Sequence, residues 1–263
     1  MFMKSANTAN NAWRELADDV MKYGTLSAPR GIACRELIGY QSCIDMRSPL
    51  VATPGRNLGM KFAAAEAAWI LSGDNKVETI QPYSKMIANF SDDDQRFFGA
   101  YGPKIIDQMT HVVSSIENDP DTRQAVINIW RENPRKTKDT PCTVSCQFIV
   151  RDDTIHAIDT MRSSDVWLGW PYDVFNFTML AGFVALEIRE RTGKELKMGQ
   201  LILNAGSQHV YESNFEAIET ALFGPDNFEV DQRFDPHKFN SPKHLVSSLW
   251  DAAREGNVID IVS

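Results

Sequence analysis

The sequence contains no apolar run long enough to cross a membrane and no excess of basic residues. Its 263 residues carry a formal net charge of −8, so no global positive field would attract nucleic acid. No stretch reaches the roughly 18 apolar residues of a transmembrane helix. The N-terminal segment also lacks the basic start and apolar run of a signal peptide. We therefore expect no membrane or nucleic-acid partner, and a cytoplasmic location.

Cysteine is scarce, and the chain shows no repeats, low-complexity tracts or long linkers. Four cysteines in a chain of this length do not form a disulfide framework, and without an export signal reduced thiols are expected. No zinc-finger spacing of Cys and His is present, so we expect no metal. Apolar residues make up 43% of the chain and charged residues 24%, as is usual for globular proteins. We expect one domain over residues 1–263, large enough to bury a substantial core.

Hydrophobic periodicity predicts both helices and strands, without regular alternation along the chain. This arrangement favours an α+β fold over a doubly wound α/β fold. The predicted helices cover residues 10–24, 61–74, 103–119, 173–193 and 210–224. The predicted strands cover residues 125–130, two segments of 142–161 on either side of a turn at 151–153, and 198–206.

The clearest candidate nucleophile is Cys142, which follows Pro141 at the predicted start of a strand. Catalytic groups are often displayed at such loop-to-strand junctions. A reactive thiolate needs a cation nearby to lower its pKa, and Arg162 in "MRSSD" or Arg30 in "SAPRG" offers one. The alternative for Cys142 is a small buried thiol without a catalytic role. The alternative for Arg30, Arg162 and also Arg123 is a solvated arginine on the surface.

Six segments, taken in order, resemble the thymidylate synthase family. They are "EAAWILSGD", "FFGAYG", "NDPDTRQAV", "TPCTVSCQF", "MRSSDVWLGWPYDVFNFTMLAGF" and "GSQHVYESN", and together they span most of the chain. The resemblance implies a large mixed sheet flanked by helices, in a homodimer whose sheets pack back to back. It also implies two small-molecule partners, a nucleoside monophosphate and the co-substrate 5,10-methylenetetrahydrofolate.

The resemblance assigns the chemistry to Cys142 and Glu66. Cys142 would add to C6 of a pyrimidine nucleotide, which turns C5 into a carbon that can attack an electrophilic one-carbon unit. Glu66 would organise water and protons near the base, because a buried carboxylate with a raised pKa can exchange protons.

The resemblance also assigns binding roles. The nucleotide would be held at its phosphate and sugar by Arg30, Arg162, Ser163, His209 and Tyr211. Arg123 would reach the phosphate from the second subunit, since arginines bind phosphate bidentately and stay charged. The folate would contact Asp165, Trp69 and Gly169. The alternative for His209 and Tyr211 is ordinary packing within the core.

One position departs from the synthases in a way that bears on the base. Thymidylate synthases carry an Asn where this chain has Asp173, at the end of "WPYD". Uracil presents an N3–H donor and an O4 acceptor, whereas cytosine presents an N3 acceptor and an N4 amino donor. An ionised carboxylate only accepts, so it would repel O4 but accept from N4 and favour a protonated N3. Asp173 therefore favours a cytosine nucleotide, unless it pairs with a cation elsewhere.

Other departures concern the nucleophile's neighbour, the phosphate and the region near the folate. Thr143 follows the nucleophile where synthases usually have His, as expected in the deoxycytidylate hydroxymethylase branch. Arg123 is followed by Gln124 instead of a second arginine, which puts one phosphate contact in doubt. Residues 78–98 contain no Trp where synthases have a Trp-rich stretch, so this region is expected to be wetter and to favour capture by water.

These features favour a transferase that converts dCMP, 5,10-methylenetetrahydrofolate and water to 5-hydroxymethyl-dCMP and tetrahydrofolate. A CMP hydroxymethylase remains open, because the sugar-end residues do not exclude a 2′-hydroxyl. A dUMP-methylating synthase that tolerates Asp173 also remains open. A catalytically idle nucleotide- or RNA-binding member is a third alternative, but a pure binder would need no Cys142 nucleophile.

Overall fold

The computed structural model describes residues 7–224 and 231–263, which are built around one mixed sheet of six strands. The strand order is β1-β2-β6-β5-β4-β3. The bounds are β1 Thr25–Ser27, β2 Cys34–Asp45, β3 Val126–Asn128, β4 Thr143–Arg151, β5 Thr154–Asp165 and β6 Lys197–Tyr211. Neighbouring strands are antiparallel except for the parallel pair β5 and β6. The predicted α+β fold with a large mixed sheet is confirmed.

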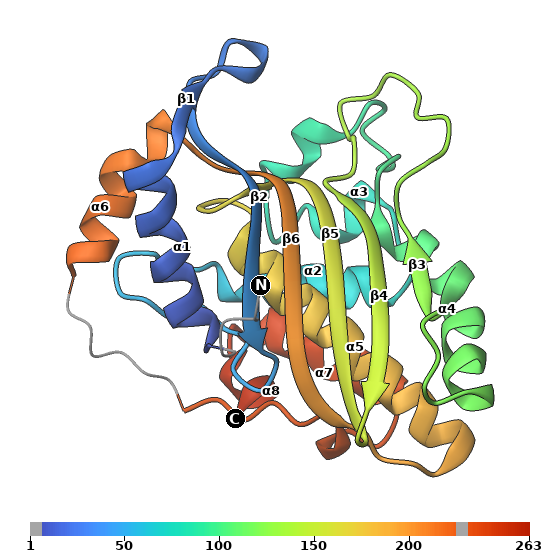
Figure 1. Ribbon diagram of the computed structural model, residues 1–263. Coiled ribbons are helices and arrows are strands. Elements are labelled where there is room, and N and C mark those ends of the chain that lie inside the picture. Colours follow the sequence, from blue (N-terminus) through green and yellow to red (C-terminus); the bar gives the residue numbers. More distant parts are fainter. Residues whose placement is uncertain (1–6, 225–230) are drawn as a thin grey trace.

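Helices pack on one face of the sheet and around its edges (Figure 1). The helices are α1 Ala9–Tyr23, α2 Met60–Leu71, α3 Val77–Ile80, α4 Tyr101–Asn118, α5 Trp170–Thr192, α6 Phe215–Phe223, α7 Pro242–Glu255 and α8 Ile259–Val262. Four short 3₁₀ segments cover Pro29–Gly31, Ile87–Phe90, Glu212–Asn214 and Pro236–Lys238. Among the described residues, no helix is long and apolar enough to cross a membrane.

Helix α5 lies behind the sheet in Figure 1, between the strands and helices α2 and α7. Most of its side chains are buried on all sides, as expected of a helix that neighbours surround. It ends at Gly193, which adopts the left-handed conformation with φ 73° and whose N–H bonds the Arg189 carbonyl. The first turn of α5 directly follows the end of β5, and this junction forms one wall of the candidate site.

The opposite face of the central strands carries no helix in Figure 1. Side chains that point to this face are partly exposed, among them Ile158 and Thr160 of β5 and Ile202 and Asn204 of β6. A sheet face with partly exposed isoleucines and no covering helix is typical of a surface that another molecule covers.

Two expectations about the elements need correction. The strand predicted at 198–206 continues to Tyr211, because β6 pairs with both β2 and β5 almost to its end. The helix predicted at 210–224 therefore begins only at Phe215. Strand β2 and helix α7 were not predicted, although β2 pairs with β6 over most of its length.

Candidate active site

The ends of β4 and β5 bring the predicted nucleophile beside its predicted cation. The Cys142 Sγ lies 3.7 Å from Nη2 of Arg162 and 3.7 Å from Oγ of Ser163. The guanidinium is held by two carbonyls of the loop before the nucleophile, with Nε donating to Pro141 at 2.9 Å and Nη2 to Thr140 at 3.0 Å. The structure thus brings together three residues that the sequence analysis selected.

The charge state of Cys142 depends on opposing neighbours. Burial raises the pKa of the thiol above its ordinary value, while Arg162 and the Ser163 hydroxyl act in the opposite direction. The carboxyls of Asp173 and Asp139 raise it further. The thiol is therefore protonated at rest, and Arg162 is the neighbour that favours the thiolate.

Helix α2 contributes Glu66 to the same region. Its Oε2 accepts a hydrogen bond of 2.8 Å from Nδ2 of Asn176 on α5. Burial raises the pKa of Glu66 to about 7, and the bond from Asn176 only partly opposes this shift. Glu66 can therefore gain and lose a proton near neutral pH, as general acid–base chemistry requires.

Asp173 lies in the first turn of α5, close to the other acids. Burial raises the pKa of its carboxyl well above the usual range, and Glu66 and Asp165 add to this shift. No hydrogen bond or cation among the described residues opposes it. A Cβ placed on Gly169 would lie 3.4 Å from Oδ2 of Asp173, so the carboxyl rests against the turn that precedes α5. The argument from sequence took Asp173 as ionised, whereas this environment favours the neutral acid.

Asp165 anchors the turn between β5 and α5. Its Oδ1 accepts the backbone N–H groups of Trp167 and Leu168, each at 2.8 Å, while Oδ2 is buried and has no partner. Trp69 of α2 is 5% exposed, packs edge-on against Phe97, and has a buried indole N–H without a partner. One orphaned acceptor and one orphaned donor fit a pterin ring, which carries groups of both kinds.

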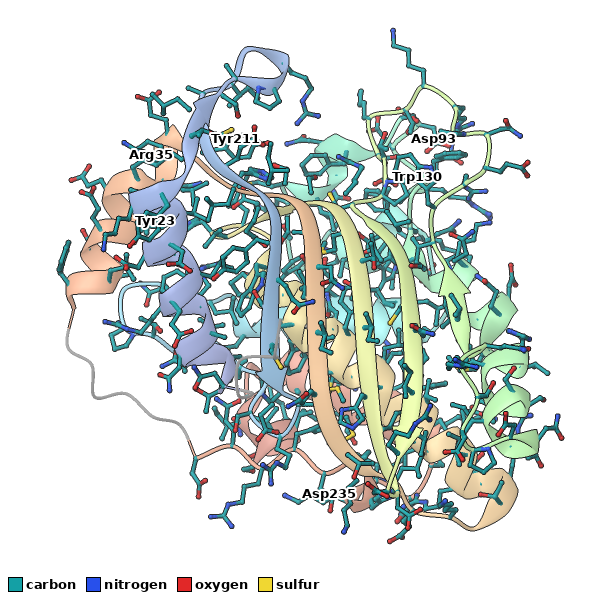
Figure 2. All side chains as sticks on the ribbon, in the orientation of Figure 1. Tyr23, Arg35, Asp93, Trp130, Tyr211 and Asp235 are labelled. Carbon is teal, nitrogen blue, oxygen red and sulfur yellow. The ribbon has the colours of Figure 1, made fainter. Side chains whose placement is uncertain are left out.

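Strand β6 supplies the residues predicted for the sugar. The rings of His209 and Tyr211 lie 5.1 Å apart in an edge-on arrangement, and His209 Nδ1 is buried without a partner. His209 pairs in register with Asp165 on β5 and with Glu36 on β2. Tyr211 marks the upper end of the sheet in Figure 2, away from Asp235 at the lower end.

Among the described residues, Arg162 is the arginine that contacts Cys142, and neither Arg30 nor Arg123 does so. Arg30 is exposed on the hairpin between β1 and β2, and its side chain makes no bond to the described residues. Arg123 is also exposed, and its carbonyl accepts from the Gln147 side chain. Gln147 is five residues from Cys142, or roughly 16 Å at the rise of an extended strand. Within this chain, Arg123 therefore lies well away from Cys142.

Several residues near the site escaped the sequence analysis. The Tyr101 hydroxyl accepts the backbone N–H of Thr143 at 3.2 Å, and its charge would interact with Cys142 and Asp173. Asp159 of β5 is fully buried with both carboxyl oxygens unpartnered. Burial raises the pKa of Asp159 well above the usual range, and Asp173 adds to this shift. Asp159 lies inside a predicted strand whose periodicity already explained it, and Tyr101 lies in the motif "FFGAYG", to which no role was assigned.

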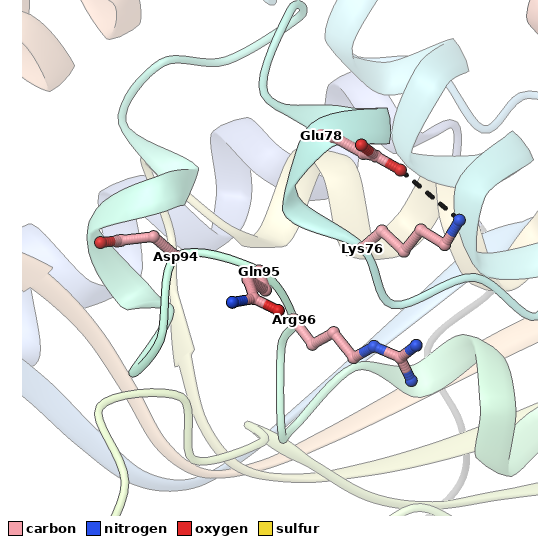
Figure 3. Close-up of a pocket in the computed structure, with 5 residues that line it drawn as sticks. All are labelled: Lys76, Glu78, Asp94, Gln95 and Arg96. Carbon is pink, nitrogen blue, oxygen red and sulfur yellow. Dashed lines mark ion pairs between the residues drawn. The ribbon is translucent and has the colours of Figure 1, made fainter.

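A surface pocket of about 250 Å³ lies elsewhere, around the bridge between Lys76 and Arg96 (Figure 3). Its lining is Lys76, Glu78, Asp94, Gln95 and Arg96. Lys76 and Glu78 form an exposed ion pair at 3.5 Å, and none of the predicted site residues lines the pocket. Within residues 7–224 and 231–263, no group of three or more His, Cys, Asp or Glu side chains could hold a metal.

Comparison with known proteins places these residues in context. Residues 11–228 match the protein family described as Thymidylate synthase. The chain belongs to the thymidylate synthase family. Enzymes of this family transfer a one-carbon unit from methylenetetrahydrofolate to a nucleoside monophosphate.

Three relatives illustrate the range of the family. A thymidylate synthase of Vesicomyosocius okutanii subsp. Calyptogena okutanii (strain HA) is 26% identical over 71% of this chain and 73% of its own length. A thymidylate synthase of Coxiella burnetii (strain Dugway 5J108-111) is 24% identical over 77% of this chain and 80% of its own. A deoxyuridylate hydroxymethyltransferase of Bacillus phage SP01 is 28% identical over 82% of this chain but only 61% of its own length.

Proposed function

We propose that this protein is a folate-dependent hydroxymethyltransferase that converts dCMP to 5-hydroxymethyl-dCMP. The observation that carries the base assignment is Asp173, a carboxyl that has no hydrogen-bond partner among the described residues and lies close enough to Cys142 to affect its charge. The phage SP01 relative, named for hydroxymethyl transfer, supports the same type of reaction.

The neutral acid of Asp173 complements cytosine at both positions of the base edge. Its O–H would donate to N3, and its carbonyl oxygen would accept from the N4 amino group. Transfer of that proton to N3 would leave a carboxylate against a protonated base. The protonated base is electrophilic at C6, where the Cys142 thiolate adds. Asp173 would thus provide the proton that the addition requires.

The other site residues would bind the phosphate, exchange protons and bind the folate. Arg162 would stabilise the thiolate and, with Ser163, hold the 5′-phosphate. Glu66 keeps Oε1 free while Oε2 is bound to Asn176, so Oε1 would exchange protons with water near the base. Methylenetetrahydrofolate supplies the one-carbon unit to C5, and Asp165 with Trp69 and Gly169 would bind its ring.

The choice between a hydroxymethyl and a methyl product depends on access of water to C5. Three carboxyls border the site, and carboxyls bind water well. The neighbouring segment 78–98 contains no Trp that would exclude it. We therefore infer that water completes the reaction and that the product carries a hydroxymethyl group.

We also infer that the active unit is a homodimer formed through the helix-free face of the sheet. Arg123 is exposed and lies far along β4 from the nucleophile of its own chain. A two-fold partner that covers this face could bring its own Arg123 to the phosphate.

Hydroxymethylation of dUMP is the second candidate. A neutral Asp173 also fits uracil, with its O–H donating to O4 and its carbonyl accepting from N3–H. The phage SP01 relative is named as a deoxyuridylate enzyme, which favours this reading. Methylation of dUMP stays a third reading, because two of the relatives are named thymidylate synthase.

One experiment separates these reactions. The protein is incubated with methylenetetrahydrofolate and dCMP, CMP or dUMP in separate reactions, and each nucleotide product is analysed by mass spectrometry. We expect dCMP to be consumed fastest and to gain a hydroxymethyl group. Preferential consumption of dUMP would exclude the cytosine assignment, and a methyl gain would exclude water as the final acceptor.

A further inference from the structure

Strand β2 adds a carboxylate to a row of side chains that crosses the sheet at the candidate site. Glu36 on β2 pairs in register with His209 on β6, and His209 pairs in register with Asp165 on β5. Side chains of residues paired in this way lie on the same face of a sheet. Glu36 therefore lies beside His209 on the face that carries the site, on the side of His209 away from Asp165.

A serine on β6 holds the Glu36 carboxylate and connects it to the neighbourhood of the nucleophile. The Ser207 hydroxyl donates a hydrogen bond of 2.6 Å to Oε2 of Glu36. Ser207 pairs in register with Ser163 on β5, and the Ser163 hydroxyl lies 3.7 Å from Sγ of Cys142. The bonded pair of Ser207 and Glu36 thus begins one strand spacing, roughly 5 Å, from the residue beside the nucleophile.

Glu36 can bind a further hydrogen-bond donor. Its side chain is partly exposed, and within residues 7–224 and 231–263 no Lys or Arg forms an ion pair with it. Hydrogen bonds from Ser207 and Ser27 hold the pKa of the carboxyl below its ordinary value, and His209 acts in the same direction. An ionised carboxylate accepts about four hydrogen bonds and donates none. A ligand group that binds Glu36 must therefore be a donor.

A nucleotide bound at Cys142 would present its sugar to this carboxylate. Cys142 would add to C6 of the base, and the sugar is attached to the ring nitrogen next to C6. His209 and Tyr211, the residues proposed for the sugar, lie on the same face of β6 and beside Glu36. The sugar of dCMP has one hydrogen-bond donor, its 3′-hydroxyl, whereas the 5′-phosphate is an anion that Glu36 would repel. The 3′-hydroxyl is therefore the group that suits Glu36.

We propose that Glu36 is a specificity-determining residue that accepts a hydrogen bond from the 3′-hydroxyl of the nucleotide. His209 and Tyr211 would donate to the oxygen of that hydroxyl, so that its proton points to Glu36. The protein would then select free nucleotides and reject those whose 3′-oxygen is missing or carries a phosphate, as it does within a nucleic acid strand. This inference rests on the proposed function in that a nucleoside 5′-monophosphate is taken to bind at Cys142.

Three substitutions separate the carboxylate from its support and from its charge alone. Glu36→Ala removes the acceptor. Ser207→Ala keeps the carboxylate but removes the hydroxyl that orients it. Glu212→Ala is the matched control, because it removes an exposed carboxylate directly after β6. The measurement is the calorimetric dissociation constant of each protein for dCMP, for 2′,3′-dideoxycytidine 5′-monophosphate, for deoxycytidine 3′,5′-bisphosphate and for CMP.

The wild type should bind dCMP at least about tenfold more tightly than the dideoxy nucleotide, because a hydrogen bond to a charged group is lost. Glu36→Ala should reduce this preference roughly tenfold, and Ser207→Ala should reduce it by a smaller factor. Glu36→Ala should also bind the 3′,5′-bisphosphate better relative to dCMP, because the repelling charge is gone. Glu212→Ala should keep the wild-type ratios. Since each ratio is taken on one variant, general damage to the site cancels.

The same preference for dCMP over the dideoxy nucleotide in Glu36→Ala and wild type would overturn the inference and leave the proposed function intact. A change confined to the ratio of dCMP to CMP would also overturn it, because Glu36 would then read the 2′-position. Tighter binding of dUMP would exclude the cytosine assignment alone, since dUMP and its 3′-deoxy analogue give the same ratio. A protein that binds none of these nucleotides would remove both proposals. If thermal unfolding shows that Glu36→Ala is not folded, Glu36→Gln, which keeps the shape without the charge, replaces it.

Discussion

At the scale of single residues, the candidate site is governed by three acids whose pKa burial raises. Glu66, Asp165 and Asp173 all have a raised pKa, and burial is the largest cause for each. Neighbouring carboxyls of this kind usually titrate at different pH values. The difference allows one acid to accept hydrogen bonds, another to donate a proton and a third to exchange protons with water.

Asp173→Asn tests the acid that faces the base. An Asn amide also presents one donor and one acceptor, so it still fits uracil, but it cannot give a proton to N3 of cytosine. We expect the ratio of kcat/KM for dCMP to that for dUMP to fall at least about tenfold, or 1.4 kcal/mol. Because both substrates are measured on the same variant, general damage to the site cancels. An unchanged ratio would show that Asp173 does not read the base.

Glu66→Gln tests the acid whose pKa burial raises from 4.5 to about 7. The folded state binds this proton more tightly than the unfolded state. The free energy of unfolding therefore falls as pH rises from about 4.5 to about 7, by up to about 3 kcal/mol. Asp159, Asp165 and Asp173 also have a raised pKa, so in urea unfolding across this range Glu66→Gln should show a fall smaller than the wild type's by about this amount. Glu255→Gln, at an exposed position on α7, controls for the loss of one carboxyl and should keep the wild-type slope.

At the scale of elements, how well a helix or strand could be predicted from the sequence depended on how completely it is buried. Helix α5 was predicted well because it is apolar around its circumference and ends at Gly193. Strand β2 was missed because its sequence, "CRELIGYQSCID", mixes charged and apolar residues, and only its second half alternates between buried and partly exposed positions. The predicted strand for its partner β6 ended too early for a related reason. Pairing with β2, which was not predicted, extends β6 to Tyr211.

The residues of the candidate site likewise fall into those that a local sequence motif could predict and those that it could not. Cys142, Arg162 and Asp173 could be selected from sequence because a contiguous motif carries each of them. Glu36 could not, because a glutamate among charged and apolar neighbours is expected on the surface until pairing with β6 places it opposite His209. The neutral state of Asp173 also depends on the distant Glu66 of α2, which no local pattern shows.

Gly206→Ala tests how closely β6 must approach β5 beside the nucleophile. A Cβ on Gly206 would lie 2.9 Å from the Arg162 carbonyl oxygen, closer than the backbone can accept, so the strands must separate there. We expect this to displace Arg162 and lower kcat/KM at least about tenfold. Gly193→Ala is the matched control, because its φ of 73° makes Ala strained while no atom lies within 4 Å of the new Cβ.

The control should lose about 1 kcal/mol of stability and keep its activity, because Gly193 lies near the turn between β4 and β5, at the opposite end of β4 from Cys142. The measurements are steady-state kinetics and thermal unfolding of both variants. Equal loss of activity in the two variants, or full activity in Gly206→Ala, would contradict a requirement for close packing at Arg162.

At the scale of the whole molecule, the chain presents an incomplete phosphate site and an uncovered sheet face. Arg162 and Ser163 lie beside Cys142, but Arg123 lies along β4 at a distance that its side chain cannot span. The exposed face of β5 and β6 has no covering helix (Figure 1). A two-fold dimer would resolve both features at once, because each chain would cover the other's sheet and lend its Arg123.

Subunit mixing tests this arrangement. Arg123→Ala and Cys142→Ser are each expected to be inactive as homodimers. In a mixed dimer, one site combines the intact Cys142 of the first chain with the intact Arg123 of the second, and the other site has neither. Random exchange of equal amounts makes half the dimers mixed, with one of two sites restored. Activity should therefore return to about a quarter of the wild-type value for a two-fold dimer.

The matched control mixes Cys142→Ser with Arg162→Ala. Arg162 contacts Cys142 within a single chain, so every site in that mixture lacks one of the two residues, and no activity should return. Exchange is verified by native mass spectrometry of differently tagged chains, and activity is followed by release of tritium from C5 of the nucleotide. If neither mixture regains activity after exchange, Arg123 does not act across the interface. If both do, activity returns without a complete set of residues at any site, and the two arginines cannot be assigned to different chains.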